Sequence, residues 1–130
     1  MSETDSILNI EAVGKSFREP TGILRVLQSL SLRVRAGEIV LLQGPSGSGK
    51  TTLLQIAGCL LRADEGRVEL AGRELNAASE AALTTARQRH LGFAFQHFHL
   101  VEALTVRDNV ALGLRLKRQP ENAMGSDLSI

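Results

Sequence analysis

At positions 44–51 the chain carries the stretch Gly44-Pro45-Ser46-Gly47-Ser48-Gly49-Lys50-Thr51, which matches the pattern G-x-x-x-x-G-K-T. The apolar run before it, residues 38–43, predicts a buried strand, and the pattern of residues 52–57 predicts a helix after it. A strand, a glycine-rich loop and a helix in this order are the context that a phosphate-binding loop needs. The stretch therefore predicts such a loop.

The residue types in this loop suit phosphate. Its glycines let backbone N–H groups point at phosphate oxygens, and the first turn of the following helix adds free N–H groups and the positive end of the helix dipole. Lys50 is predicted to reach the β- and γ-phosphates, and the Thr51 hydroxyl to ligate the bridging magnesium ion, with Thr52 as a second hydroxyl within reach. The predicted binding set is Gly44, Pro45, Ser46, Gly47, Ser48, Gly49, Lys50, Thr51 and Thr52. A surface turn that ends in Lys-Thr by chance is the plain alternative, and the flanking elements argue against it.

Composition and charge limit the class of protein. With 130 residues, 43% of them hydrophobic and 22% charged, the chain has the composition of one soluble globular domain. A net charge of +1 gives no electrostatic case for nucleic-acid binding. The amino terminus predicts no secretory signal, and the most apolar segment, residues 53–61, is shorter than the roughly 20 residues of a membrane helix. Any membrane association is therefore expected to come through a partner.

The remaining segments predict further strands and helices. Before the loop, residues 7–13 predict a first strand, followed by Phe17 and a loop through residues 19–22. Residues 26–34 form a strand-like run in which apolar and polar residues alternate from position 30 to 34, and this predicts a half-exposed antiparallel strand. The elements predicted after the loop helix are a strand over residues 67–70, a helix over 79–89 capped by Ser79, a strand over 90–96, a helix from the capping box of Thr105 and Asp108 to about Arg115 or Lys117, and a loose tail over 119–130.

A phosphate-binding loop alone leaves a kinase, a GTPase and an ABC-type ATPase open, and three other segments distinguish among them. Phe17 lies upstream of the loop, Phe95-Gln96 ends a predicted strand, and residues 105–110 follow it. In these segments, and in the approach to the loop over residues 30–42, the chain resembles the ATP-binding subunits of ABC transporters.

The resemblance extends from residue 7 to about residue 118. Within the family, residues 75–80 and 93–100 are most similar to the branch that powers lipoprotein release, macrolide export and cyanobacterial glycolipid export. The implied fold is α/β: a P-loop NTPase core of ABC type with an antiparallel β subdomain, truncated before the signature motif. Residues 1–118 are expected to form a partial ABC-type ATP-binding domain.

The resemblance also implies ligands, partners and a location. ATP and Mg²⁺ are expected at the loop, with Phe17 stacked on the adenine ring and Gln96 touching the magnesium ion or its water and sensing the γ-phosphate. The expected partners are an integral membrane permease subunit and a second ATP-binding domain, in a homodimer or heterodimer. The expected location is cytoplasmic, on the inner face of the plasma membrane. From the residues alone, Gln96 is equally well explained as a polar strand-end residue that makes ordinary hydrogen bonds. The alternative for Phe17 is a core or loop aromatic, and stacking on the base is favoured.

Three features of the family are absent from these 130 residues, and one of them is the switch histidine. We find no Leu-Ser-Gly-Gly-Gln signature and no apolar strand that ends in Asp-Glu, where the family has its magnesium-binding carboxylate and general base. Residues 60–65 imitate that strand, but they follow the loop helix directly and leave no room for the crossover that a parallel strand requires. The chain is therefore expected to bind nucleotide and to hydrolyse it slowly or not at all.

Three functions stay open on this evidence. The first is an ATP-binding, energy-coupling subunit of an ABC exporter, and the second is a non-hydrolytic ATP-binding module that modulates a full-length ATPase. The third is a small-molecule kinase, against which Phe17 and Gln96 argue. Residues 97–99 predict an apolar surface for a membrane-subunit helix rather than a metal site, because His90 and Cys59 add no ligand pattern.

Overall fold

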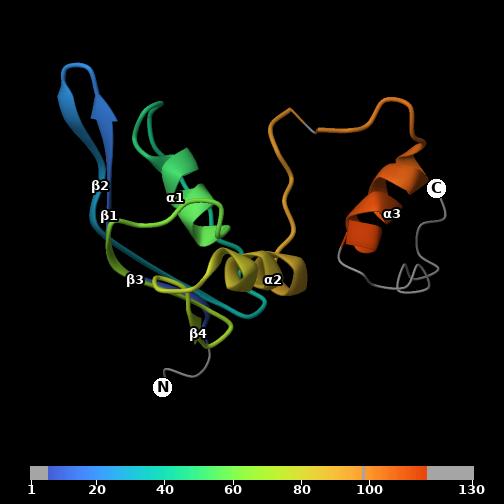
Figure 1. Ribbon diagram of the computed structural model, residues 1–130, viewed down its shortest axis with the longest axis horizontal. Coiled ribbons are helices and arrows are strands. Elements are labelled where there is room, and N and C mark those ends of the chain that lie inside the picture. The colour runs from blue at the N-terminus through green and yellow to red at the C-terminus, as the bar shows by residue number, and fades with distance from the viewer. Residues whose placement is uncertain (1–5, 98, 117–130) are drawn as a thin grey trace. The chain divides into compact units, whose positions relative to one another are not determined.

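The computed structural model describes residues 6–97 and 99–116, and the chain divides into two compact units, residues 1–90 and 91–130. The first unit is built on a four-stranded sheet in the order β2-β1-β3-β4, in which every neighbouring pair is antiparallel (Figure 1). Its strands are β1 (Ser6–Glu19), β2 (Gly22–Arg35), β3 (Glu65–Leu70) and β4 (Arg73–Glu74).

The strands β1 and β2 form a long hairpin, in which β1 is longer than the sequence predicts. A turn at Pro20 and Thr21 joins the two strands. The apolar residues of β2 between positions 30 and 34 are half-buried and the polar ones exposed, which confirms the predicted alternation. Phe17, however, does not lie past the end of the first strand, because β1 continues through it and pairs it with Leu24.

The core of the first unit lies on one face of the sheet, under the two helices α1 (Lys50–Ala57) and α2 (Glu80–His90) (Figure 1). Side chains from α1, β3 and α2 meet around a small cavity of about 20 Å³ that Ile56, Val68 and Leu83 help to line. Ser79 caps α2 as predicted, since its hydroxyl accepts a hydrogen bond from the Ala82 amide at 3.2 Å. The buried apolar side chains are Ile10, Val13, Leu27, Leu53, Ile56, Cys59, Val68, Leu70, Leu75 and Leu83.

A close backbone approach joins β1 to β3. The ladder between these strands is interrupted between Glu11 and Gly14, where Ala12 has a φ of 47°. Gly66 of β3 lies against this bulge with a φ of +84°, and an added Cβ there would collide with the carbonyl oxygens of Glu11 and Ala12. Only glycine therefore fits at position 66 without moving one strand away from the other.

Two predicted strands do not form. Residues 38–43 have no regular secondary structure, and Ile39 and Leu41 are 97% and 76% exposed. Residues 91–95 are also irregular, while His90 ends α2 and Gln96 lies in a turn. In the described part of the chain no strand pairs with either segment. A strand needs a neighbour for its backbone hydrogen bonds, so apolar composition alone does not make one.

The second unit contains the helix α3 (Val106–Leu116). The Thr105 hydroxyl accepts a hydrogen bond from the Asp108 amide at 3.1 Å and donates to the Asp108 carboxylate at 2.6 Å, which confirms the predicted cap. The rings of Phe93 and Phe95 are stacked with centroids 5.6 Å apart. Phe98 and the predicted tail, residues 119–130, lie outside the described residues.

Candidate functional site

The predicted phosphate-binding loop leads directly into α1. The Ser48 amide donates to the Pro45 carbonyl at 3.3 Å and closes a tight turn. Gly49 follows as the N-cap of α1 in the left-handed conformation, with a φ of 90°. An added Cβ at Gly49 would lie 2.9 Å from the Leu27 side chain and 3.1 Å from the Val26 carbonyl oxygen, both on β2. The loop therefore needs glycine here both for its conformation and for its contact with the sheet.

Lys50 folds back over the concave side of this loop. Its Nζ donates to the carbonyl oxygens of Gly44 at 2.6 Å and Pro45 at 2.7 Å, and to the Ser48 hydroxyl at 3.2 Å. The side chain is half-buried, and its ammonium lies at the centre of the turn. The structure thus brings the one positive side chain of the loop to the place where the surrounding backbone would hold a phosphate.

The start of α1 offers backbone donors to an anion. Within the described residues the amides of Gly49, Lys50, Thr51 and Thr52 donate to no protein acceptor, and the first turn contains no acidic side chain. Such a helix start carries a partial positive charge. Thr51 is exposed in this turn and Thr52 is half-buried, so both hydroxyls lie beside the same amides. The donor set fits a triphosphate, with a hydroxyl available for magnesium.

Phe17 lies on the hairpin near this loop. Its strand neighbour Lys15 pairs with Leu27, whose side chain faces the Gly49 backbone. At about 3.4 Å per residue, Phe17 is two residues or about 7 Å further along the strand. The Phe17 side chain is 37% exposed, and the Lys15 Nζ lies 5.6 Å from its ring centroid. The ring is therefore an accessible aromatic surface on the same unit as the phosphate-binding loop.

Asp64 is a residue of this region to which the sequence reasoning assigned no role. It follows α1 and accepts hydrogen bonds from the Lys15 Nζ at 2.6 Å and from the Ser16 amide at 2.8 Å. The hydrogen bond from Lys15, followed by that from the Ser16 amide, lowers the pKa of the Asp64 carboxyl below its ordinary value. The only sequence signal was an acidic residue in the turn before β3, and the partner that gives it a role lies 49 positions away.

We expect acid to remove the contribution of Asp64 to stability. Because its pKa is lowered in the folded chain, the interaction stabilises the fold above the ordinary aspartate pKa of about 3.9, and this is lost as the pH falls through the lower folded value. The difference in unfolding free energy between the parent chain and Asp64→Asn should therefore shrink below about pH 4. Urea unfolding of both proteins across this range measures it, and a difference independent of pH would contradict the assignment.

Gln96 belongs to the second unit. It is exposed in a turn that follows Phe95, and the ring of His99 lies 4.9 Å from that of Phe95. The predicted contact of Gln96 with magnesium stays a prediction, since the two units are described separately. Among residues 6–97 and 99–116, no three histidine, cysteine, aspartate or glutamate side chains gather as a metal-binding group.

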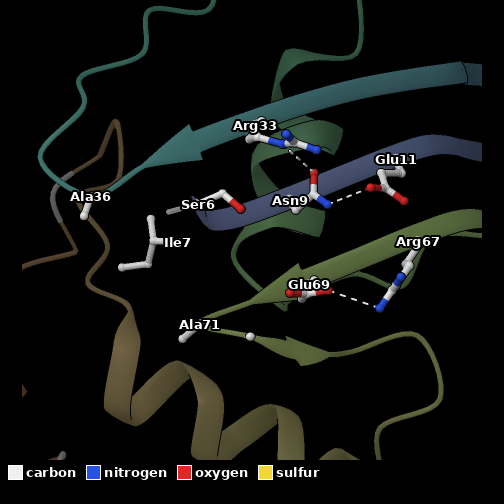
Figure 2. A pocket seen from close by; sticks show the side chains of 10 residues that line it. Ser6, Ile7, Asn9, Glu11, Arg33, Ala36, Arg67, Glu69 and Ala71 are labelled. Carbon is white, nitrogen blue, oxygen red and sulfur yellow. Dashed lines mark hydrogen bonds and ion pairs between the residues drawn. The ribbon is translucent and has the colours of Figure 1, made fainter. Parts of the chain in front are cut away.

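A hollow of about 810 Å³ lies on the sheet face opposite the helices, and it contains no residue of the phosphate-binding loop. Figure 2 shows its polar side chains standing on adjacent strands. Asn9 donates to Glu11 at 2.7 Å and accepts from Arg33 at 3.4 Å, and Arg67 donates to Glu69 at 3.1 Å. These polar side chains already hydrogen-bond to one another across an open surface. The loop therefore remains the candidate site for a nucleotide.

Comparison with known proteins agrees with the loop geometry. The family model described as "ABC transporter" matches residues 27–128, which is most of the chain. The chain belongs to the ABC transporter family. The lipoprotein-releasing system ATP-binding protein LolD of Paramagnetospirillum magneticum is 42% identical over 114 residues, covering 88% of this chain and 50% of LolD. The family resemblance predicted from the sequence is confirmed, and the relatives at 42% identity include LolD, which belongs to the predicted branch.

Two further members of the ABC transporter family are informative. The sulfate/thiosulfate import ATP-binding protein CysA 1 of Chromobacterium violaceum is also 42% identical, over 94% of this chain and 31% of CysA 1. The dimeric, post-hydrolysis cassette MJ0796 bound to ADP and Pi superposes with a TM-score of 0.78 at 37% identity, covering 85% of this chain and 47% of that one. The predicted ABC-type fold is thereby confirmed. The chain spans about half the length of LolD.

No helix in the described part of this ABC family member is long and apolar enough to cross a membrane. Residues 60–65 are similar in sequence to the family's Asp-Glu strand, but residues 60–64 form no strand. Asp64 lies in a bend immediately before β3. The prediction that this run is not a parallel strand beside the loop is confirmed, because β3 begins only at Glu65 and pairs antiparallel with β1.

Proposed function

We propose that this chain binds Mg-ATP at the loop of residues 44–52 and belongs to an ATP-binding subunit that couples the nucleotide to export through a membrane permease. The observation that carries the proposal is the convergence of the Lys50 ammonium, the free amides at the start of α1 and the Thr51 hydroxyl on one concave loop. This set offers a triphosphate a cation, backbone donors and a magnesium ligand together.

The residues of this chain divide the work of holding the nucleotide. Lys50 neutralises phosphate charge, the amides of Gly49 to Thr52 donate to phosphate oxygens, and Phe17 offers its exposed ring to the base. Magnesium, held by Thr51, supplies charge neutralisation between the phosphates. Attack by water needs a positioned base, and we assign none of these residues that role.

Support for export and for assembly comes from relatives. LolD is named for lipoprotein release and CysA 1 for import, at equal identity, so the direction of transport rests on the segments at residues 75–80 and 93–100. MJ0796 was solved as a dimer with ADP and Pi. We propose a second ATP-binding domain and a permease subunit as partners, at the cytoplasmic face of the membrane.

A calorimetric titration of the chain with Mg-ATP tests nucleotide binding. We expect saturable heat with one nucleotide bound per chain, and weaker binding when EDTA removes magnesium, because the metal offsets the repulsion between phosphates. Absence of any saturable signal from a chain that circular dichroism shows to be folded would contradict the proposal.

Replacing Gln96 with Ala tests its proposed role as a sensor. We expect the affinity for Mg-ATP to change by less than about twofold, since Gln96 would meet the magnesium ion or its water and none of the loop amides. The same titration measures it. A large loss of affinity would show that Gln96 is a primary ligand or a structural residue.

A further inference from the structure

Phe17 stands on a part of β1 that the rest of the sheet does not support. The pairing of β1 with β3 ends at Gly14, opposite Glu65. Among the described residues, the strand from Lys15 to Glu19 pairs with β2 alone. Figure 1 shows the tip of this hairpin extending past β3. A two-stranded ribbon is marginally stable by itself. The orientation of Phe17 therefore depends on what holds the root of the ribbon.

Asp64 holds that root with three hydrogen bonds. Its amide donates to the Gly14 carbonyl at 2.9 Å, one carboxylate oxygen accepts from the Ser16 amide at 2.8 Å, and the other accepts from the Lys15 Nζ at 2.6 Å. The β1–β2 register is irregular on both sides of Lys15, so the ladder does not fix this point by itself. Asp64 thus fixes the segment that the ladder leaves irregular.

Lys15 connects Asp64 to the ring of Phe17. Its side chain is 12% exposed, and its Nζ lies 2.6 Å from the Asp64 carboxylate and 5.6 Å from the centroid of the Phe17 ring. An ammonium at this distance attracts the ring face. Lys15 is also the ladder partner of Leu27, whose side chain faces Gly49. Lys15 therefore contacts both Asp64 and the Phe17 ring. It also pairs with β2, the strand against which the phosphate-binding loop packs.

We infer that Asp64, acting through Lys15, is a positioning residue for the nucleotide base: it sets the Phe17 ring at a fixed place relative to the phosphate-binding loop. The inference rests on the proposed function, since it assigns the base to Phe17 and the triphosphate to the loop. Loss of the Asp64 carboxylate should then weaken recognition of the base and leave recognition of the phosphates unchanged.

Replacing Phe17 with Trp allows the stacking of the base on residue 17 to be measured by fluorescence. The chain contains no Trp and no Tyr, so Phe17→Trp introduces a single indole reporter. We would titrate this protein, with and without Asp64→Asn, with Mg-ATP and with magnesium tripolyphosphate, which has the phosphates but no base. Fluorescence reports stacking on residue 17, and calorimetry gives both affinities.

We expect ATP to quench the indole and tripolyphosphate to leave it unchanged. Asp64→Asn should weaken ATP binding about fivefold and reduce the quenching at saturation, because part of the stacking interaction is lost. The tripolyphosphate affinity should change by less than about twofold. Asp64→Glu should restore part of the ATP affinity, since a carboxylate again accepts from Lys15. Glu74→Gln, which neutralises an exposed carboxylate paired with Arg67 at 3.1 Å, should change neither affinity.

The other outcomes overturn either the inference alone or the proposed function with it. Equal losses for ATP and tripolyphosphate would show that Asp64 acts on the loop or the fold, and unchanged ATP affinity and quenching would show that Asp64 does not position the ring; either result overturns the inference alone. Failure of the parent chain to bind either ligand would overturn the proposed function, and the inference with it.

Discussion

Replacing Lys50 with Ala should lower the affinity for Mg-ATP by about tenfold to a hundredfold, the largest effect that we expect from any single side chain of the site. The substitution removes the positive side chain at the centre of the loop and with it a charge-assisted hydrogen bond to phosphate. It also removes the hydrogen bonds from Nζ to the Gly44 and Pro45 carbonyls, which shape the loop. Calorimetric titration with Mg-ATP measures the change.

The matched control for this prediction is Arg89→Ala. It removes one positive charge from an exposed side chain of α2, outside the loop. We expect the affinity of this variant to stay within about twofold of the parent value, because an exposed charge at a distance is screened by salt. An unchanged affinity of the Lys50 variant would refute the assignment of the phosphate site. Equal losses of affinity in both variants would show that Lys50 contributes only through the net charge of the chain.

Replacing Gly66 with Ala should destabilise the fold by roughly 4 kcal/mol, as the sum of two costs. The backbone has a φ of +84°, which an alanine adopts only under strain, and the new methyl group would collide with the carbonyl oxygens of Glu11 and Ala12. Relief of that collision separates β3 from β1 at the bulge. Urea unfolding followed by circular dichroism gives the change in unfolding free energy, and in a marginally stable chain the variant will not fold.

Gly72→Ala separates the two costs. Gly72 also has a positive φ, 75°, but no heavy atom lies within 4 Å of an added Cβ. This variant therefore carries the conformational strain alone, about 1–2 kcal/mol. If both variants lose the same stability, the close approach of Gly66 to β1 has no energetic weight, and the contact between β1 and β3 at the bulge is looser than described.

Elements that depend on nearby residues could be predicted from the sequence. Ser79 and Thr105 cap their helices through hydrogen bonds that span three positions, so the residue types alone locate both helix starts. The alternation over residues 30–34 identifies a half-exposed strand because the period of two is local. The conformation of the loop before α1 and the position of the helix start belong to the same class, since the glycines and Lys50 are adjacent in the chain.

Elements that depend on distant partners could not be predicted in this way. Residues 38–43 have the composition of a buried strand, yet without a neighbouring strand in the described part of the chain they stay irregular and exposed. Phe17 was expected beyond the end of a strand, and only the pairing of Phe17 with Leu24 shows that β1 continues. The role of Asp64 likewise depends on its hydrogen bonds with Lys15 and Ser16, which no local sequence pattern predicts.

The three hydrogen bonds of Lys50 also affect the thermodynamic signature of ligand binding. A flexible surface lysine gives up as much as about 2 kcal/mol of rotamer entropy when it is immobilised. Lys50 has already given up that freedom on folding, because Gly44, Pro45 and Ser48 hold its Nζ. A phosphate would therefore exchange acceptors with the loop and would not have to order a mobile side chain. The entropic cost falls on the folding reaction, so a change that loosens the loop weakens phosphate binding even where it touches no ligand atom.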